Sequence, residues 1–306
     1  MKPFDLAQLG WLTLLLAVAG YLSSAAELPA SAAGSASDAP RDASGHVPAR
    51  RHFQRIASGS AYADELLLAL AEPERIVALS SQGHRSTSEP YRYGDRALIA
   101  GPSDLERLLN LHVDLLLITR FGGQAELARA REGGIEVFDL GDMRGLANLE
   151  DNIRALAALL GDPARGERLW RSWSRQFRAV ARDIPTRERK AAMYVAIYAN
   201  KLYGGTRGTS YHDVLTAAGL DDLAAPQYRD WPQYDPEQLL ALDPALIVTE
   251  DGMAEPICHH SWLRSLRACA HSYQGILEIS RNLMGSAGLG MLDAALELHS
   301  LVYPPD

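Results

Sequence analysis

The stretch Gly59 to Leu66, read as GSAYADEL, decides the fold because it occurs a second time, as GTSYHDVL at Gly208 to Leu215. Both copies share the pattern Gly-(Ser/Thr)-x-Tyr-x-Asp-x-Leu. In each copy the Gly-(Ser/Thr) pair is expected to follow a strand and to open a helix. The repeat therefore predicts two helices that begin in the same way.

A second pair of matching segments follows in the same order. Asp104 to Leu115 reads DLERLLNLHVDL and Asp235 to Leu246 reads DPEQLLALDPAL, which gives Asp-x-Glu-x-Leu-Leu-x-Leu-x-x-x-Leu. The copies lie too far apart for a solenoid, whose repeats span about 20 to 50 residues. We therefore expect two similar lobes. The alternative is a chance similarity between two leucine-rich helices.

Apolar, β-rich runs alternate with helical stretches along the chain. Such alternation is typical of α/β folds with parallel sheets. We expect an N-terminal α/β lobe at residues 51–162 and a C-terminal α/β lobe at residues 186–306. The predicted strands are Arg75 to Leu79, Val113 to Thr119, Ile135 to Leu140, Ala191 to Tyr198, Ala245 to Thr249 and Ile276 to Ile279.

One long bridging helix is predicted between the lobes, at residues 163–185. It starts at Pro163, directly after Asp162, and proline is favoured at the first helical position. Its apolar residues recur every three or four positions, which gives one stripe along a helix of about 20 residues, or ~30 Å. The alternative is an ordinary amphipathic helix of one lobe. The stripe consists of Trp170, Trp173, Phe177, Val180 and Ile184.

The N-terminus carries the features of an export signal. Trp11 to Leu22 is an apolar run that is too short to cross a membrane, and Ser24-Ala25-Ala26 offers the small residues that signal peptidase requires. We expect residues 1–26 to be a signal peptide cleaved near Ala26, with the mature protein in the periplasm; an uncleaved anchor is the alternative. Residues 27–50 are mostly small and polar, which predicts a disordered linker.

The net charge and the cysteines limit the possible partners. The chain has 306 residues and a formal net charge of −8, so nucleic acid and acidic membrane surfaces are unfavourable partners. Cys258 and Cys269 are the only cysteines, and in an exported protein they predict a disulfide. Free thiols are one alternative. A metal site with the nearby His259, His260 and His271 is another.

The segment Trp231 to Ala241, read as WPQYDPEQLLA, resembles the substrate-binding proteins of bacterial ABC importers for vitamin B12 and ferric siderophores. The resemblance extends from Arg55 to Tyr303. It implies a monomer without enzymatic activity or cofactor, in which two lobes are joined by one helix. Its cargo would be a metal chelate, cobalamin or a ferric siderophore, that is held between the lobes and delivered to an ABC permease.

The resemblance also implies a permease-docking role for one glutamate in each lobe. In this family such glutamates pair with arginines of the permease, and the matching residues here are Glu106 and Glu237. Each is predicted to lie in the first turn of a helix, where a carboxylate interacts favourably with the helix dipole. Helix stabilisation alone is therefore the alternative explanation.

Ligand contacts are expected beyond the carboxyl ends of the strands, where α/β sheets place their sites. Gly59-Ser60 and Gly208-Thr209 are expected to follow the first strand of each lobe and to open helices whose backbone N–H groups can face a polar ligand. Tyr62 and Tyr211 lie in the first turns of these helices, either as pocket walls or as core aromatics. Trp231 matches a pocket tryptophan of the B12-binding members and could stack on a flat ligand.

Three arginines follow predicted strands or the glycine-rich loop. Arg120, Arg207 and Arg281 could bind an anionic chelate, because a guanidinium group matches a carboxylate or phosphate with two parallel hydrogen bonds. Tyr203 lies on the same loop as Arg207. The segment Ser280 to Leu283 departs from the B12-binding members, so their cobalamin contacts do not transfer. The choice between cobalamin and a siderophore stays open.

Other functional classes receive less support. The chain lacks a Gly-x-Ser-x-Gly elbow, a His-Glu-x-x-His pair and a phosphate-binding Gly-x-x-x-x-Gly-Lys loop, so we expect no enzyme. The alternatives are a periplasmic protein that binds haem or a metal ion and a ligand sensor on the same fold. A haem-binding protein would use tyrosine or histidine from a cleft loop, and the candidates are His84, Tyr91, Tyr93 and His212.

Overall fold

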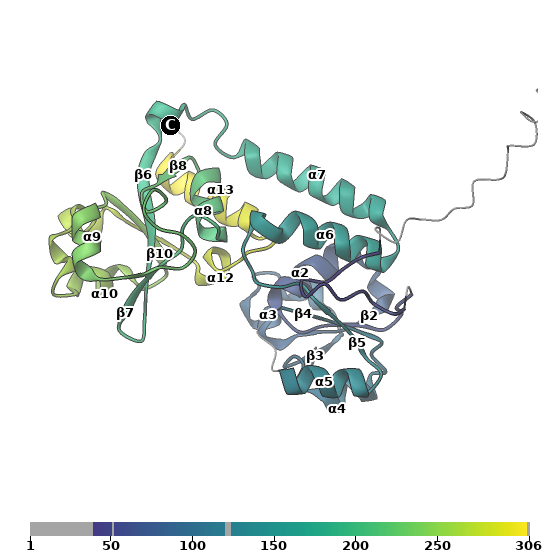
Figure 1. Ribbon diagram of the computed structural model, residues 1–306. Helices are drawn as coiled ribbons and strands as arrows, with labels where there is room; N and C mark the ends of the chain where they lie inside the picture. The colour runs from purple at the N-terminus through teal and green to yellow at the C-terminus, as the bar shows by residue number, and fades with distance from the viewer. Residues whose placement is uncertain (1–38, 51, 120–123, 305–306) are drawn as a thin grey trace, which may run out of the picture. The chain divides into compact units, whose positions relative to one another are not determined.

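The computed structural model describes residues 39–50, 52–119 and 124–304. The expected signal peptide, the first part of the linker and Arg120 lie outside the described residues. Residues 40–306 belong to one compact unit, and both sheets lie within it (Figure 1). Among the residues described, no helix combines the length and apolar character needed to cross a membrane.

The first sheet contains five parallel strands in the order β3-β2-β1-β4-β5. Its strands are short and largely buried, as expected for a parallel sheet covered on both faces. The strand order reverses between β1 and β4, and α/β folds place ligands at such a reversal. The strands are β1 (Ile56–Ser58), β2 (Ile76–Ser80), β3 (Ala97–Ile99), β4 (Leu115–Ile118) and β5 (Glu136–Asp139).

Five α-helices of this lobe lie in the part of the chain that the structure describes. The side chain of Ser60 caps the first of them by accepting a hydrogen bond from the Ala63 amide at 3.2 Å. The last of them ends at Gly161, whose φ of 92° is unfavourable for residues with a side chain. The helices are α2 (Ala61–Leu70), α3 (Ser81–Ser86), α4 (Leu105–Asn110), α5 (Gln124–Glu132) and α6 (Leu146–Leu160).

The second sheet combines a parallel part with an antiparallel arm. Its order is β11-β10-β6-β7-β9, with β8 also paired to β6. Strands β8, β6, β10 and β11 are parallel, whereas β7 and β9 are antiparallel to their neighbours. The strands are β6 (Lys190–Tyr198), β7 (Lys201–Gly204), β8 (Leu220–Asp222), β9 (Gln233–Tyr234), β10 (Leu246–Glu250) and β11 (Ile276–Ile279).

The antiparallel arm departs from the expected parallel sheet. Ala199 and Asn200 turn the chain between β6 and β7, and both have positive φ, 47° and 59°. Two consecutive positive φ angles suit the right-handed twist of a two-residue hairpin. Alanine is not a usual residue for such a turn, so the hairpin could not be predicted from this segment. The expectation that Gly208 follows the first strand of its lobe is therefore wrong, because β7 intervenes.

The helices of the second lobe are mostly short. The longest, α13 (Met291–Val302), contacts α8 and α7. An aspartate side chain and a glutamine form a capping box at the start of α9, with Asp235 as the capping residue and Gln238 as its partner. The remaining helices are α8 (Ser210–Ala217), α9 (Pro236–Leu242), α10 (Ala254–His259), α11 (Ala270–Tyr273) and α12 (Arg281–Met284).

The bridging helix is present as α7 (Pro163–Ala179) and lies alongside α6 (Figure 1). Its 17 residues correspond to about 26 Å, shorter than expected because the chain leaves the helix before Val180. It contacts α2 and α6 of the first lobe and α8 and α13 of the second. The lobe boundaries at residues 51–162 and 186–306 stay a prediction.

Two side chains tie the loop between α12 and α13 to the first lobe and to α7. The indole Nε1 of Trp173 donates to the backbone oxygen of Leu289 at 2.9 Å. The Glu65 carboxylate on α2 accepts hydrogen bonds from the Gly290 amide at 3.2 Å and the Ser286 hydroxyl at 3.3 Å. Burial raises the pKa of Glu65. The loop is thus bound from two sides.

The linker expectation is wrong for its last part, because residues 42–49 pack along β5. The Ala43 amide donates to the Asp139 oxygen at 2.8 Å, and His46 lies 2.7 Å from the Glu136 carboxylate. Asp42 is only 6% exposed. Disorder was predicted because the segment has few apolar residues to bury. That prediction does not consider the unpaired backbone N–H and C=O groups of an edge strand, to which a polar segment can bond. Hydrogen bonds hold this segment together with the burial of Pro48.

The repeated motifs occupy equivalent positions in the two lobes. The Gly-(Ser/Thr)-x-Tyr copies open α2 and α8, and the Asp-x-Glu copies form α4 and α9. The last leucine of each Asp-x-Glu copy begins a strand, Leu115 in β4 and Leu246 in β10. The expected fold of two similar α/β lobes joined by one long helix is confirmed.

Candidate ligand site

The loop after β5 reaches the second lobe. The Leu146 amide donates to the Asp213 carboxylate at 2.7 Å, and the Arg144 guanidinium pairs with Asp230. Gly145 has φ +71°, and a Cβ there would lie 2.5 Å from Asp213 Oδ2. Only glycine fits this approach without a shift of the neighbouring chain. The two lobes therefore meet at this loop.

Trp231 lies at the same junction. The guanidinium carbon of Arg144 lies 5.1 Å from the centroid of the Trp231 ring, within the range of a cation–π contact. The indole is 43% exposed, which is unusual for so large an apolar side chain. A partly exposed tryptophan beside an arginine offers both stacking and charge to a ligand. The sequence alone did not indicate Arg144.

The glycine-rich loop before α8 is shaped by two tyrosines. A Cβ on Gly204 would lie 2.4 Å from the Tyr234 ring, and one on Gly205 would lie 2.2 Å from the Tyr211 ring. The rings thus pack directly on the backbone of this loop. Arg207 follows in the loop with its side chain exposed. The loop pairs with the segment before β9, so Arg207 lies near Asp230, whose amide donates to its oxygen at 3.0 Å.

The carboxyl end of β10 carries a buried acid, Glu250, which is 2% exposed. Its carboxylate accepts hydrogen bonds from the hydroxyls of Tyr194, at 3.0 Å, and Tyr198. Arg281 Nε donates to the same carboxylate at 2.6 Å. Tyr211 stacks on Tyr194 with ring centroids 4.0 Å apart. This Glu250 cluster therefore joins β6, β10, α8 and the start of α12.

The cluster holds its groups in defined protonation states. Burial and then the hydrogen bond to Glu250 raise the pKa of Tyr198 to about 12. Burial also raises the pKa of Tyr194 and of Tyr211. The hydrogen bond to Glu250 raises the pKa of Arg281 further above its usual range. At neutral pH the tyrosines are neutral and Arg281 is charged.

The sequence pointed to part of this cluster. It placed Tyr211 and Arg281 among the ligand candidates and overlooked Glu250, Tyr194 and Tyr198. Glu250 directly follows the predicted strand at residues 245–249, which is a usual position for a site residue. Tyr194 and Tyr198 are separated by four residues in a strand and thus share a face. Both patterns could have indicated these residues.

Several other predicted ligand residues have structural roles. Tyr62 is 4% exposed and its hydroxyl accepts a hydrogen bond from Asn152 Nδ2 at 2.9 Å, so it is a core aromatic instead of a pocket wall. Ser60 caps α2. Thr209 is buried and donates to the Thr206 oxygen at 2.7 Å. Tyr203 lies 6.2 Å from Tyr198, centroid to centroid, and remains half-buried beside the cluster.

Of the haem candidates, His84 and Tyr93 lie together with ring centroids 5.3 Å apart, and the other two bond to other residues. The Tyr93 hydroxyl is buried and donates to Asp64 at 2.9 Å, and the exposed Tyr91 donates to Glu89 at 2.6 Å. His212 Nδ1 lies 2.8 Å from the buried Asp222 carboxylate, which raises the pKa of this histidine. Among the residues described, no group of three or more histidine, cysteine or acidic side chains could hold a metal ion.

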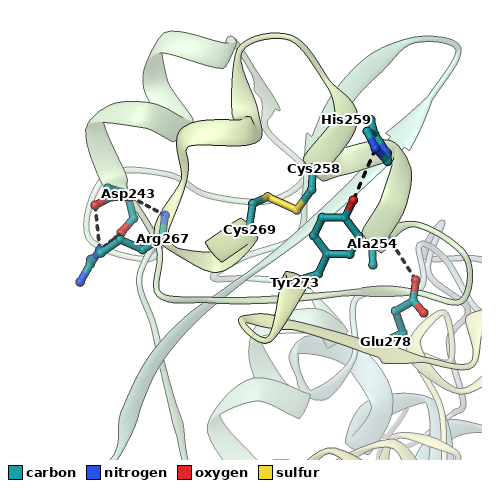
Figure 2. The surroundings of a disulfide bond; sticks show 8 residues. All are labelled: Asp243, Ala254, Cys258, His259, Arg267, Cys269, Tyr273 and Glu278. Atoms are coloured by element: carbon teal, nitrogen blue, oxygen red, sulfur yellow. Dashed lines mark hydrogen bonds and ion pairs between the residues drawn. A yellow bond between two sulfur atoms is a disulfide. The ribbon is translucent and has the colours of Figure 1, made fainter. Parts of the chain in front are cut away.

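The predicted disulfide is present between Cys258 and Cys269, whose Cα atoms lie 5.4 Å apart (Figure 2). It joins the end of α10 to the turn before α11. The alternatives of free thiols and of a cysteine metal site are therefore wrong. His259 Nε2 lies 3.4 Å from the Tyr273 hydroxyl, and Glu278 accepts a hydrogen bond from the Ala254 amide at 2.8 Å.

The two predicted docking glutamates are both exposed. Glu106 lies in the first turn of α4 and Glu237 in the first turn of α9. Within the described ranges, neither carboxylate has a hydrogen-bond or ion-pair partner. Both side chains are thus free to meet another protein, and the docking role stays a prediction.

A separate hollow lies at the opposite edge of the first sheet. Arg55, Arg96 and Arg107 line it, beside the starts of β2 and β3. Ligands of α/β sheets bind beyond the carboxyl ends of the strands. We therefore place the candidate site at the Glu250 cluster and the Trp231 junction and not at this hollow.

Comparisons with known proteins agree with this architecture. The chain is 28% identical over 154 residues to the vitamin B12-binding protein of Salmonella typhimurium strain LT2. The aligned region covers 50% of this chain and 57% of that protein. The chain thus matches little more than half the length of these curated relatives.

Two solved structures share the fold. The apo form of the periplasmic heme-binding protein RhuT from Roseiflexus sp. RS-1 aligns with a TM-score of 0.67 at 22% identity, over 82% of this chain and 98% of that one. The vitamin B12-binding protein BtuF of Vibrio cholerae aligns with a TM-score of 0.61 at 20% identity, over 82% and 96%. A family model described as periplasmic binding protein matches residues 56–271, and the chain belongs to this family.

Proposed function

We propose that this protein is the periplasmic substrate-binding component of an ABC importer and that it binds a metal chelate between its lobes. The observation that carries the proposal is the junction where Trp231, 43% exposed, meets Arg144 from the other lobe. A large exposed ring at the meeting point of two lobes suits a bulky, partly flat ligand better than a sugar or an amino acid.

The class of chelate is supported by the relatives. One relative is a vitamin B12-binding protein, and solved structures of the same fold include heme-binding proteins. Cobalamin, a ferric siderophore and haem are thus the candidate cargoes. We also propose that residues 1–26 direct export and are removed, and that the mature protein is a monomer.

Delivery to a permease is supported by the matching placement of Glu106 and Glu237. Each is an unpaired, exposed carboxylate within the described part of the chain and lies at the same position of a repeated helix. Two equivalent charges on two lobes suit a partner with two equivalent basic patches. A ligand sensor on the same fold is the second candidate, because a sensor would use the same cleft.

Tryptophan fluorescence tests the proposed binding. We would titrate the mature protein with cyanocobalamin, haemin and a panel of ferric siderophores, and we expect saturable quenching by at least one chelate. Trp231→Ala should weaken that binding by roughly 2 to 4 kcal/mol, as the loss of a central aromatic anchor does.

Trp262→Ala is the matched control. Trp262 is 58% exposed and lies near the disulfide, away from the lobe junction, so its loss should leave the affinity unchanged. Saturable binding of a free divalent ion or a small sugar, with none of any chelate, would overturn the proposed function while leaving the fold intact.

A further inference from the structure

We propose that the Glu250 cluster is an anion-recognition half-site, in which Arg281, positioned by Glu250, binds a carboxylate or catecholate group of the cargo beside the rings of Tyr198 and Tyr203. This inference rests on the proposed function and narrows its substrate class. It assigns the cargo to chelates that carry their own negative charge.

The first step is the burial of Glu250. An ionised carboxylate that is 2% exposed needs several donors to offset the loss of water. Here the donors are two tyrosine hydroxyls and Arg281 Nε, which lies 2.6 Å from Oε2. If this position served only to fill the core, an apolar side chain would do so with a smaller desolvation penalty. The carboxylate therefore serves to hold the groups around it.

The second step concerns the nitrogens of Arg281 that remain free. The side chain is 58% exposed although its Nε is bound to a buried carboxylate. Within the described residues, Nε makes the one hydrogen bond of this guanidinium. The two terminal nitrogens keep four N–H groups, in the fixed fork that matches a carboxylate. Glu250 thus fixes one end of the guanidinium and leaves the other for a ligand.

The third step concerns the rings beside Arg281. Tyr198 is 43% exposed, and the Tyr203 ring lies 6.2 Å from it at an interplanar angle of 52°. The two residues belong to neighbouring antiparallel strands, β6 and β7. Because Glu250 accepts a hydrogen bond from the Tyr198 hydroxyl, this ring is held in place and presents its apolar part. A flat ring of a ligand can contact both tyrosines while its acidic group reaches Arg281.

The fourth step is the charge balance. Glu250 and Arg281 together have no net charge, so the pair exerts little long-range attraction. Recognition must come from short, directed hydrogen bonds to an acceptor that carries negative charge. An uncharged amide makes weaker bonds to a guanidinium, and a cationic group is repelled by it. The half-site therefore favours anionic chelates over cobalamin.

Four probes of known charge test the inference. Haemin and ferric dicitrate carry a net negative charge, cyanocobalamin is neutral overall although it contains one phosphodiester, and ferrioxamine B is cationic. We expect wild-type protein to bind an anionic probe at least tenfold more tightly than the other two. Arg281→Ala should weaken that binding roughly 10- to 100-fold, the range for a lost charge-assisted hydrogen bond.

Arg264→Ala is the matched control, because Arg264 is also exposed in the second lobe but lies near the disulfide. It should bind all probes like the wild type. Tightest binding of cyanocobalamin or ferrioxamine B, or unchanged affinity in Arg281→Ala, would overturn the inference and leave the proposed function standing. Absence of binding to every chelate in the wild type would instead overturn the proposed function.

Glu250→Gln tests the positioning role. The variant keeps the shape of the side chain but leaves Arg281 with an unbalanced charge and a weaker anchor. In Glu250→Gln, we expect the affinity for the anionic probe to fall when the salt concentration is raised to 0.5 M. The affinity of the wild type should change little with salt. The same salt response in both proteins would show that Glu250 does not position Arg281.

A measurement without ligand completes the test. Removing the Glu250 charge should lower the pKa of Tyr198 from about 12 towards that of a free tyrosine. Tyrosinate absorbance near pH 11 should therefore increase in Glu250→Gln and not in the double variant that also carries Tyr198→Phe. An unchanged titration would contradict the arrangement of the cluster itself.

Discussion

The two copies of the Gly-(Ser/Thr)-x-Tyr-x-Asp motif both open a helix, but Ser60 caps its helix through its side chain and Thr209 does not, and the later side chains also differ in their use. In α2, Tyr62 and Asp64 are both buried and bond within their own lobe. In α8, Asp213 accepts a hydrogen bond from Leu146 of the other lobe, and Tyr211 stacks beside the Glu250 cluster. The first copy therefore serves the stability of one lobe, whereas the second serves the junction and the site.

The difference shows how one motif can be divided between two tasks. Asp64 accepts hydrogen bonds from the Ser80 amide at 3.0 Å, the Ser80 hydroxyl at 2.6 Å and the Tyr93 hydroxyl at 2.9 Å. Asp213 has one such partner, the Leu146 amide, across the junction. Changes to the first copy should therefore alter stability, and changes to the second should alter it much less.

The largest expected effect is the pH dependence of stability caused by Asp64. Burial raises the pKa of Asp64 from 3.8 to about 6, and the hydrogen bonds from Ser80 and Tyr93 oppose this rise. Protonation of Asp64 therefore stabilises the folded state. This contribution to the free energy of unfolding is fully present below about pH 4 and is lost as the pH rises through 6. Relative to Asp64→Asn, the wild-type free energy of unfolding should fall by about 3 kcal/mol over this range.

Urea denaturation at several pH values measures this effect. Asp213→Asn is the control from the second copy, and its difference from the wild type should be smaller because Asp213 is only half-buried. Equal pH dependence of the wild type and Asp64→Asn would show that this carboxyl does not titrate as described.

The next effect concerns the disulfide, which only the second lobe has. Replacing Cys258 and Cys269 with serine should lower the free energy of unfolding by roughly 2 to 3 kcal/mol, because the bridge restricts a short loop in the unfolded chain. Denaturation of the oxidised protein and the double variant measures this difference. A double variant as stable as the wild type would mean that the bridge adds nothing to the stability of the fold.

A smaller effect on the free energy of unfolding is expected for the tyrosines of the two motif copies, Tyr62 and Tyr211. Tyr62→Phe removes the acceptor of Asn152 and should cost about 1 kcal/mol, because a buried donor loses one partner. Tyr211→Phe keeps the stacking on Tyr194 and should stay within about 0.5 kcal/mol of the wild type. Thermal unfolding of both variants checks the order. A larger loss in Tyr211→Phe would reverse the proposed division of tasks.

The smallest effect on the isolated protein is expected for Glu106 and Glu237, where the two lobes should behave alike. The double alanine variant should keep its stability and its ligand affinity, because both carboxylates are exposed and unpaired in the described part of the chain. Binding to permease in detergent or nanodiscs should weaken, and the loss should shrink at high salt. Loss of ligand affinity would assign these glutamates to the pocket.

The sequence predicted the elements whose residues carry a periodic or repeated pattern. The predicted strands, both motif copies and the Cys258–Cys269 disulfide are present, because apolar alternation, helix starts and cysteine number follow from local rules. The β6–β7 hairpin was missed because Ala199 adopts a positive φ without a local sequence reason. Residues 42–49 were missed because they are held by polar contacts to β5.

The candidate site could be predicted only in part. Trp231, Arg207 and Arg281 were predicted from a strand end, a glycine-rich loop or a known motif, and their role in ligand binding stays a prediction. Glu250 and Arg144 depend on pairing between segments distant in sequence, which no local pattern reveals. The choice between pocket wall and core aromatic stayed open for Tyr62 for the same reason, since its partner Asn152 lies in another helix.

The loop between α12 and α13 has a consequence for protein engineering. Trp173 holds it through the Leu289 oxygen and Glu65 holds it chiefly through the Gly290 amide, so its attachment uses mainly backbone atoms. Because these bonds use backbone atoms, a side-chain substitution at Leu289 leaves both of them in place, whereas Ala287 is 4% exposed and belongs to the core. Tuning how firmly this loop is attached, for use in a biosensor, would instead require changes at Glu65 or Trp173, on the side that holds the loop.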